Sequence, residues 1–317
     1  MDGEKKVLLY IDSMQRGGAQ RVMNVLSGCL CSKGIETVLV NDIVPVDGIV
    51  EYRINPKIKR LFLDEDSKQG KKSNLVRVKK LRKIVKNEKP DVILSFLGPP
   101  NIRMLVATSG LPCKKYVSVR NDPYKEYGGG IKRLIAGLLF HLSNGCVFQT
   151  EMAAQYFPLS VQRKSRVILN PVDEAFFSEK WEGSENSIIC VGRLYPQKNH
   201  ELLLRAFQYI HKVNPDIKLK ICGKGTEELK LRNIAENLGV ANSVDFLGEI
   251  SNVKREIAKS KCFVLSSNYE GLPNALMEAM AVGAPVVSTD CPGGGPRMLI
   301  TNRINGVLVP CGDEHAL

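Results

Sequence analysis

Short apolar runs, polar loops and stretches with apolar residues at helical spacing follow one another through most of the chain. The apolar runs have the length of buried strands, and the stretches between them have the period of helices. Strands that alternate with helices build parallel sheets, so the pattern predicts an α/β protein with doubly wound parallel sheets. The strands are expected at residues 7–11, 37–40, 59–63, 91–97, 115–119, 146–148, 167–169, 187–191, 217–222, 244–247, 262–265, 285–288 and 307–309.

An acidic, aromatic and irregular stretch interrupts this alternation at residues 172–186. We therefore expect a first Rossmann-like domain at 1–171, a linker at 172–186 and a second Rossmann-like domain at 187–317. The last residues, 313–317, have the character of a helix that is just beginning.

Two predicted helices carry unusual faces. Residues 68–89 hold ten Lys and Arg residues, with Glu88 as the one acidic residue. The apolar side of this helix would dock on a sheet, and its basic side would either lie in water or meet anionic lipid headgroups. A second apolar stripe runs at helical spacing from Ile131 to Leu142. It predicts core packing, with partial lipid contact as the alternative.

Composition and charge narrow the class of protein. Apolar residues make up 44% and charged residues 25%, which is typical of soluble globular proteins. Nine cysteines without framework spacing indicate reduced thiols and a cytoplasmic location. The net charge is +12, but residues 1–170 hold 29 Lys and Arg against 15 Asp and Glu, whereas residues 171–317 hold 16 against 18. The basic first half predicts an acidic partner, either an anionic membrane surface or nucleic acid.

The stretch from Cys262 to Met280 combines an apolar strand, a polar loop and a helix whose first turn Asn274 is expected to cap. A strand end followed by a helix N-terminus is a ready site for an anionic ligand. The carboxylates Glu270 and Glu278 would then bind hydroxyl groups, although Glu278 could equally face solvent.

Two basic residues, Arg193 and Lys198, follow an earlier strand of the same half. Arg and Lys side chains neutralise phosphate groups. Together with the helix start and the two carboxylates, they suit a ligand with a diphosphate, a ribose and a second sugar. The second half therefore predicts a nucleotide-sugar site.

Four motifs resemble those of the retaining glycosyltransferases of family four, whose arrangement of two Rossmann-like domains facing a cleft is called GT-B. They are Gly17–Arg21, Val191–Asn199, the E-x7-E run from Glu270 to Ala281, and Asn305–Val309. The segments 95–97 and 118–123 resemble a subgroup that adds sugars, often N-acetylhexosamines, to lipid-linked or capsular oligosaccharides. Relatives continue past residue 317 into closing helices, so we expect the second domain to lack them here.

The resemblance also implies roles for individual residues. Catalysis is expected from Glu270, Arg193 and Lys198: the two cations would neutralise the leaving diphosphate, and Glu270 would hold hydroxyls of the donor sugar. Further donor contacts are expected from Gly17, Gly18, Gly248, Ile250, Gly271, Leu272, Pro273, Asn274 and Glu278. Acceptor contacts are expected from Arg21, Arg120 and Asn121. Arg120 stands where many relatives carry His, and Met298 lies near a position where many carry Glu.

The expected function is transfer of a hexose or N-acetylhexosamine, with retention, from a nucleotide-sugar to a lipid-linked or polysaccharide acceptor in cell-surface glycan synthesis. The resemblance implies a UDP-linked donor and no metal or other cofactor. The protein would lie at the cytoplasmic face of the membrane, with its basic first domain against anionic lipids and no nucleic-acid partner.

Other interpretations remain open from the sequence. Gly223-Lys224-Gly225 nearly matches the dinucleotide fingerprint of dehydrogenases but lacks the third glycine. The run 64–66 resembles the D-x-D metal site of single-domain transferases. A sugar-nucleotide epimerase shares the fold, and a non-catalytic nucleotide-sugar-binding subunit of a partner transferase would share the donor site.

Overall fold

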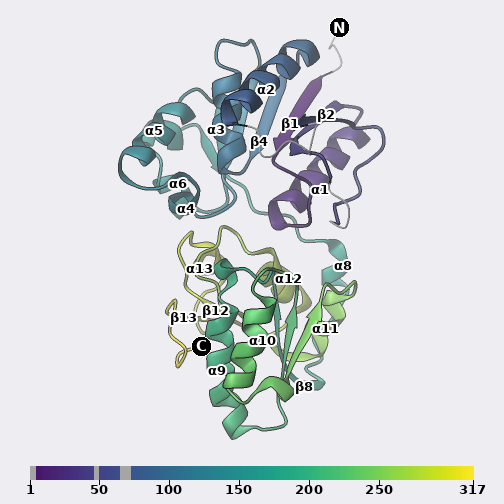
Figure 1. The fold of residues 1–317 in the computed structure, drawn as a ribbon, viewed down its shortest axis with the longest axis vertical. Helices are drawn as coiled ribbons and strands as arrows, with labels where there is room; N and C mark the ends of the chain where they lie inside the picture. Colours follow the sequence, from purple (N-terminus) through teal and green to yellow (C-terminus); the bar gives the residue numbers. More distant parts are fainter. Residues whose placement is uncertain (1–4, 46–49, 65–72) are drawn as a thin grey trace. The chain divides into compact units, whose positions relative to one another are not determined.

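The computed structural model describes residues 5–45, 50–64 and 73–317 (Figure 1). The chain divides into two compact units, residues 1–169 and 170–317. Each unit is a parallel sheet with helices packed against it, so the predicted fold class of two Rossmann-like domains is confirmed.

The first unit contains, within its described residues, a seven-stranded parallel sheet in the order β3-β2-β1-β4-β5-β6-β7. The order reverses at β1, which pairs with both β2 and β4. Its strands are β1 (Lys6–Ile11), β2 (Glu36–Ile43), β3 (Lys59–Asp64), β4 (Val92–Phe96), β5 (Lys114–Ser118), β6 (Gly145–Phe148) and β7 (Ser165–Val167). Its helices are α1 (Gly18–Ser32), α2 (Asn74–Glu88), α3 (Gly98–Ala107), α4 (Pro123–Tyr127), α5 (Gly130–Phe140), α6 (Glu151–Gln155) and α7 (Leu159–Gln162).

Alternate residues of β1 belong to two different buried clusters. Leu8 and Tyr10 belong to one buried cluster, whereas Leu9 and Ile11 belong to another that includes Met23 of α1. Successive side chains of a strand point to opposite faces, so this sheet is covered on both sides.

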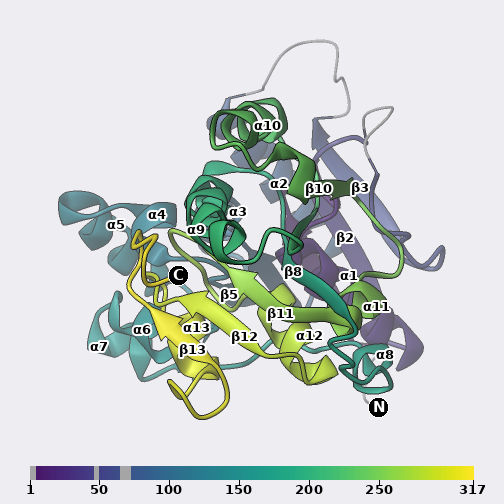
Figure 2. The same cartoon turned by 90° about the horizontal axis from the view of Figure 1, so that it is seen from below.

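The second unit repeats the design with a six-stranded parallel sheet, again counted over described residues, in the order β10-β9-β8-β11-β12-β13. Figure 2 shows β8, β11, β12 and β13 side by side. The strands are β8 (Glu185–Val191), β9 (Lys218–Cys222), β10 (Val244–Gly248), β11 (Ser260–Leu265), β12 (Val286–Thr289) and β13 (Val307–Val309). The helices are α8 (Glu174–Phe177), η1 (Pro196–Lys198), α9 (His200–Val213), α10 (Glu228–Asn237), η2 (Ala241–Ser243), α11 (Val253–Lys259), α12 (Asn274–Val282) and α13 (Gly295–Leu299).

The segment predicted as a linker, 172–186, instead packs as part of the second unit. Phe176 of α8 is buried in a core cluster of that unit. The indole nitrogen of Trp181 donates to the carbonyl oxygen of Ser260 at 2.8 Å, and its backbone N–H donates to the carbonyl of Val282 at 3.0 Å. The aromatic side chains of Phe176 and Trp181 therefore anchor this segment to the second unit.

The apolar stripe at 131–142 is not core, contrary to its prediction. Helix α5 buries Ala136, Gly137 and Phe140, whereas Ile131 and Leu134 are 74% and 64% exposed. The basic helix α2 does dock on the sheet, with Leu81 and Val85 buried. Residues 68–72 of the predicted basic stretch lie outside the described residues.

Candidate functional site

Glu270 is held in a buried polar cluster on the loop that follows β11. The residue is 6% exposed as a whole, and its Oε1 accepts hydrogen bonds from Lys198 Nζ and Ser267 Oγ, each at 2.6 Å. Lys198 ends η1, on the loop that follows the neighbouring strand β8. A carboxylate taken out of water needs a nearby charge and hydrogen-bond donors, and this cluster supplies both. Lys198 and Glu270, predicted as catalytic residues, therefore meet at one edge of the second sheet.

Gly293 on the loop after β12, and Gly295 at the start of α13, let this segment pack closely against the loop of Glu270. A Cβ at Gly293, whose φ is +94°, would lie 1.7 Å from the carbonyl oxygen of Glu270. A Cβ at Gly295 would lie 1.7 Å from the carbonyl oxygen of Gly271. The backbone N–H of Glu270 donates to the carbonyl of Pro292 at 2.9 Å. Any side chain at either glycine would push the loop of Glu270 out of place.

Arg193 lies on the same loop as Lys198 but does not enter the buried cluster. It is exposed, and its guanidinium carbon lies 5.2 Å from the centre of the Tyr195 ring. The arrangement leaves one basic group anchored at Glu270 and a second one open to an incoming anion.

Gly223 and Gly225 lie where the neighbouring backbone leaves no room for a side chain. A Cβ at Gly223 would lie 1.9 Å from the carbonyl oxygen of Gly192, and one at Gly225 would lie 2.2 Å from that of Leu194. The near match to a dinucleotide fingerprint is thus explained by the close approach of two loops. These loops hold the segment that carries Arg193.

Helix α12 begins at this same sheet edge. Asn274 is its first helical residue and not its cap: Pro273 occupies the cap position, with no side-chain hydrogen bond to the helix. Asn274 Oδ1 instead accepts a hydrogen bond from Asn170 Nδ2 at 2.6 Å. Glu278 is buried, at 6% exposed, so it does not face bulk solvent.

Of the other residues predicted to contact the donor, Gly248 and Ile250 lie in the second unit and Gly17 and Gly18 in the first. Gly248 has a φ of +65°, and its carbonyl oxygen accepts from the N–H of Gly223 at 2.8 Å. Ile250 packs against a core cluster of the second unit. In the first unit, Gly17 is the N-cap of α1 and Gly18 its first residue, directly after the loop that follows β1.

The predicted acceptor residues belong to the first unit. Arg21 lies in the first turn of α1, and its N–H donates to the carbonyl of Gly17 at 2.9 Å. Arg120 follows β5, with its guanidinium carbon 4.6 Å from the centre of the Phe96 ring. Burial lowers the pKa of Arg120 to about 10. Asn121 Oδ1 accepts from the N–H of Asp122 at 2.9 Å.

Glu126 on α4 is a further titratable group that is not among the predicted site residues. Its Oε2 is buried without a hydrogen-bond partner among the described residues, although the side chain as a whole is only partly buried. Burial raises the pKa of Glu126 to about 8, outweighing the N–H of Gly98 that stabilises its charged form. No motif marks this residue, because its environment comes from the ends of β4 and β5. It adds an uncharged acid to the polar groups near Arg120.

The described parts of the chain contain neither a cluster of metal ligands nor a membrane-spanning helix. Within them, no group of three or more His, Cys, Asp or Glu side chains is placed to hold a metal ion. Of the D-x-D-like run, Asp64 is described and accepts from Arg77 at 2.6 Å, while residues 65 and 66 lie outside the described residues. None of the described helices is long and apolar enough to cross a bilayer.

Comparison with known proteins decides the class of this molecule. Residues 171–317 match the family model described as glycosyl transferases group 1. The chain is 29% identical, over 98% of its length and 86% of the relative, to a Campylobacter jejuni protein named GalNAc-alpha-(1->4)-GalNAc-alpha-(1->3)-diNAcBac-PP-undecaprenol alpha-1,4-N-acetyl-D-galactosaminyltransferase. The chain is a glycosyltransferase with the GT-B fold.

A further relative and two solved structures agree with the assignment of this glycosyltransferase. A second Campylobacter jejuni protein, named N-acetylgalactosamine-N,N'-diacetylbacillosaminyl-diphospho-undecaprenol 4-alpha-N-acetylgalactosaminyltransferase, is 27% identical over 99% of this chain and 88% of its own. The solved sucrose-phosphate synthase of Thermosynechococcus elongatus superposes with a TM-score of 0.83, at 15% identity, over 98% of this chain and 87% of that one. Anabaena Alr3699/HepE in complex with UDP has a TM-score of 0.76 at 16% identity, over 98% and 87%. These structures support the fold.

Proposed function

We propose that this glycosyltransferase moves a hexose or N-acetylhexosamine from a UDP-sugar to a lipid-linked or polysaccharide acceptor, with retention of configuration and without a metal. The proposal rests chiefly on the buried pair of Lys198 and Glu270, whose charged atoms lie 2.6 Å apart. At this sheet edge the carboxylate of Glu270 can accept hydrogen bonds from sugar hydroxyls. The ammonium of Lys198 lies beside it and can neutralise a diphosphate.

In this mechanism Lys198 and Arg193 neutralise the diphosphate as it leaves, and the N-terminus of α12 adds backbone N–H groups. Glu270 accepts hydrogen bonds from hydroxyls of the donor sugar and favours positive charge at its anomeric carbon. Glu278 accepts from the ribose hydroxyls. In the first unit, Gly17 and Gly18 approach the donor, and Arg21, Arg120 and Asn121 contact the acceptor.

Support for the substrates comes from the relatives. The solved HepE complexes hold UDP and UDP-glucose. The names of the Campylobacter proteins describe undecaprenol-diphosphate-linked acceptors and transferred N-acetylgalactosamine. We therefore place the protein at the cytoplasmic membrane surface, in synthesis of a cell-surface glycan.

The test is transfer from a panel of UDP-sugars to an undecaprenyl-diphosphate-linked acceptor, with the anomeric configuration of the product read by NMR. An α-linked product from an α-linked donor supports the proposal. UDP binding without any transfer or donor hydrolysis would contradict it, as would a product of inverted configuration.

A further inference from the structure

Helix α5 leaves most of its large apolar side chains in water. Ile131, Leu134, Ile135 and Leu138 are each between 50% and 74% exposed, and Leu142 directly after the helix is 45% exposed. A single exposed Leu or Ile is ordinary, but a contiguous apolar patch marks a surface that binds something apolar.

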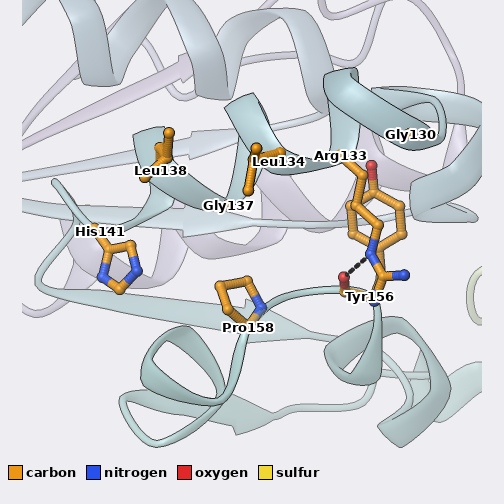
Figure 3. Close-up of a pocket in the computed structure, with 8 residues that line it drawn as sticks. All are labelled: Gly130, Arg133, Leu134, Gly137, Leu138, His141, Tyr156 and Pro158. Atoms are coloured by element: carbon orange, nitrogen blue, oxygen red, sulfur yellow. Dashed lines mark hydrogen bonds between the residues drawn. The ribbon is translucent and has the colours of Figure 1, made fainter.

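The pocket beside α5 extends this patch. It has a volume of about 440 Å³ and lies between α5 and the segment that contains Tyr156 and Pro158 (Figure 3). Gly137 keeps the helix close to that segment, because a Cβ there would lie 3.1 Å from Cδ of Pro158. At the start of α7, Leu159 is 68% exposed. The apolar surface therefore continues from α5 to α7.

The exposed charge on α5 and on the segments before and after it is mostly positive. Arg133 is exposed, but its Nε donates to the carbonyl oxygen of Tyr156 at 2.6 Å, which fixes the guanidinium at the rim of the pocket (Figure 3). Between residues 122 and 166, all of them described, the exposed charged side chains are five cations and one acid: Lys125, Lys132, Arg133, Arg163, Arg166 and Glu151. This charge is complementary to an anionic surface.

The basic helix α2 is less suited to such a surface. Arg77 is paired with Asp64 at 2.6 Å, Lys80 donates to the carbonyl oxygen of Leu63 at 2.6 Å, and Arg82 donates to that of Ala107 at 2.8 Å. These three cations are occupied within the unit, whereas Lys79, Lys83 and Lys86 of α2 are exposed. The large exposed apolar side chains of α2 are Leu75 and Val76 in its first turn, and Leu81 and Val85 are buried, so the helix offers charge without an apolar stripe along its length.

We propose that the apolar face of α5, with Lys132 and Arg133 beside it, inserts into the headgroup region of an anionic lipid bilayer. An apolar stripe bordered by Lys and Arg is the pattern of helices that lie in the membrane interface. The inference rests on the proposed function, in which the acceptor is linked to a lipid and is presented at a bilayer.

The test is co-sedimentation of the full chain with vesicles of phosphatidylglycerol and phosphatidylethanolamine, compared with vesicles of phosphatidylcholine alone. We expect binding to the anionic vesicles that weakens with added salt. The L134E/L138E variant should lose it, and K132Q/R133Q should bind roughly fivefold more weakly for each cation removed. The matched control is V213E/L229E, which places two glutamates at exposed apolar positions of the second unit and should bind like the wild type.

Equal vesicle binding by L134E/L138E and the wild type would overturn the proposal. So would light scattering that shows a wild-type dimer which L134E/L138E dissociates, because a second copy would then cover the patch. Donor hydrolysis measured without vesicles separates this inference from the proposed function. A variant that hydrolyses the donor normally yet does not sediment supports the membrane role alone.

Discussion

Lys198 Nζ lies 2.6 Å from Glu270 Oε1, so a salt bridge joins the loops that follow two neighbouring strands of the second sheet. The side chains are 18% and 8% exposed, which makes this pair more buried than an ordinary surface ion pair. Removing one partner leaves the other charge without compensation in a poorly solvated place.

Lys198→Met should therefore lower the free energy of unfolding by about 2 kcal/mol or more, measured by urea denaturation. The double variant K198M/E270M should regain most of this loss, because both charges are gone. Arg205→Met removes the exposed pair with Glu201, whose side chains are 47% and 33% exposed, and should change stability by about 0.5 kcal/mol or less. If Lys198→Met and Arg205→Met change the free energy of unfolding equally, the burial of the Lys198–Glu270 pair does not affect stability, which contradicts this prediction.

Gly293→Ala should disrupt the donor loop, because its Cβ would lie 1.7 Å from the carbonyl oxygen of Glu270. We expect a loss of about 2–4 kcal/mol in unfolding free energy and a loss of UDP binding, measured by denaturation and calorimetry. Gly239→Ala is the matched control: its φ is +72° but nothing lies within 4 Å, so it should cost about 1 kcal/mol and leave UDP binding unchanged.

His200 predicts a pH dependence of stability. It is fully buried, and neither ring nitrogen has a hydrogen-bond partner among the described residues. Burial, and then the charge of Lys198, lower the pKa of His200 to about 4. The unfolded chain takes up this proton below a pH of about 6.5 and the native chain only near 4, so stability falls as the pH drops through that window.

Acidification from pH 7 to pH 5 should thus destabilise the wild type by about 2 kcal/mol more than it destabilises His200→Leu. The measurement is urea denaturation of both proteins at the two pH values. Parallel losses in the two proteins would mean that His200 takes up its proton equally in the native and unfolded states.

Glu126 predicts the opposite dependence. Burial raises the pKa of this acid to about 8, so the unfolded chain ionises it at a lower pH than the native chain does. Stability is then lost as the pH rises from about 4.5 toward 8. Glu126→Gln removes the titration, and the wild type should lose about 3 kcal/mol relative to this variant between pH 5 and pH 7.5. A constant difference between the two proteins over this range would refute a buried, uncharged Glu126.

Much of the architecture could be predicted from apolar patterning alone. Every predicted strand is present with ends that shift by a few residues, because a buried parallel strand needs an uninterrupted apolar run. The meeting of Lys198 and Glu270 was also predictable, since both follow strands of one parallel sheet and such strands end at a common edge.

Tertiary environment was not predictable in the same way. Helical spacing shows that the large side chains of α5 share a face, but it does not say whether a neighbour covers that face. The partners of Glu270 within its cluster, Ser267 and Gln197, look like ordinary loop residues until β8 and β11 are placed side by side. Asn274 has the chemistry of a cap, yet its contact with Asn170 comes from far away in the chain.

The most direct test of the proposed mechanism is turnover of UDP-linked hexoses and N-acetylhexosamines in the presence of EDTA, followed as UDP release. We predict that the wild type turns over at least one of these donors without a divalent cation, and that Lys198→Met and Glu270→Gln each lower the rate about a hundredfold or more. Turnover that requires an added metal, or a Lys198→Met variant as active as the wild type, would contradict it.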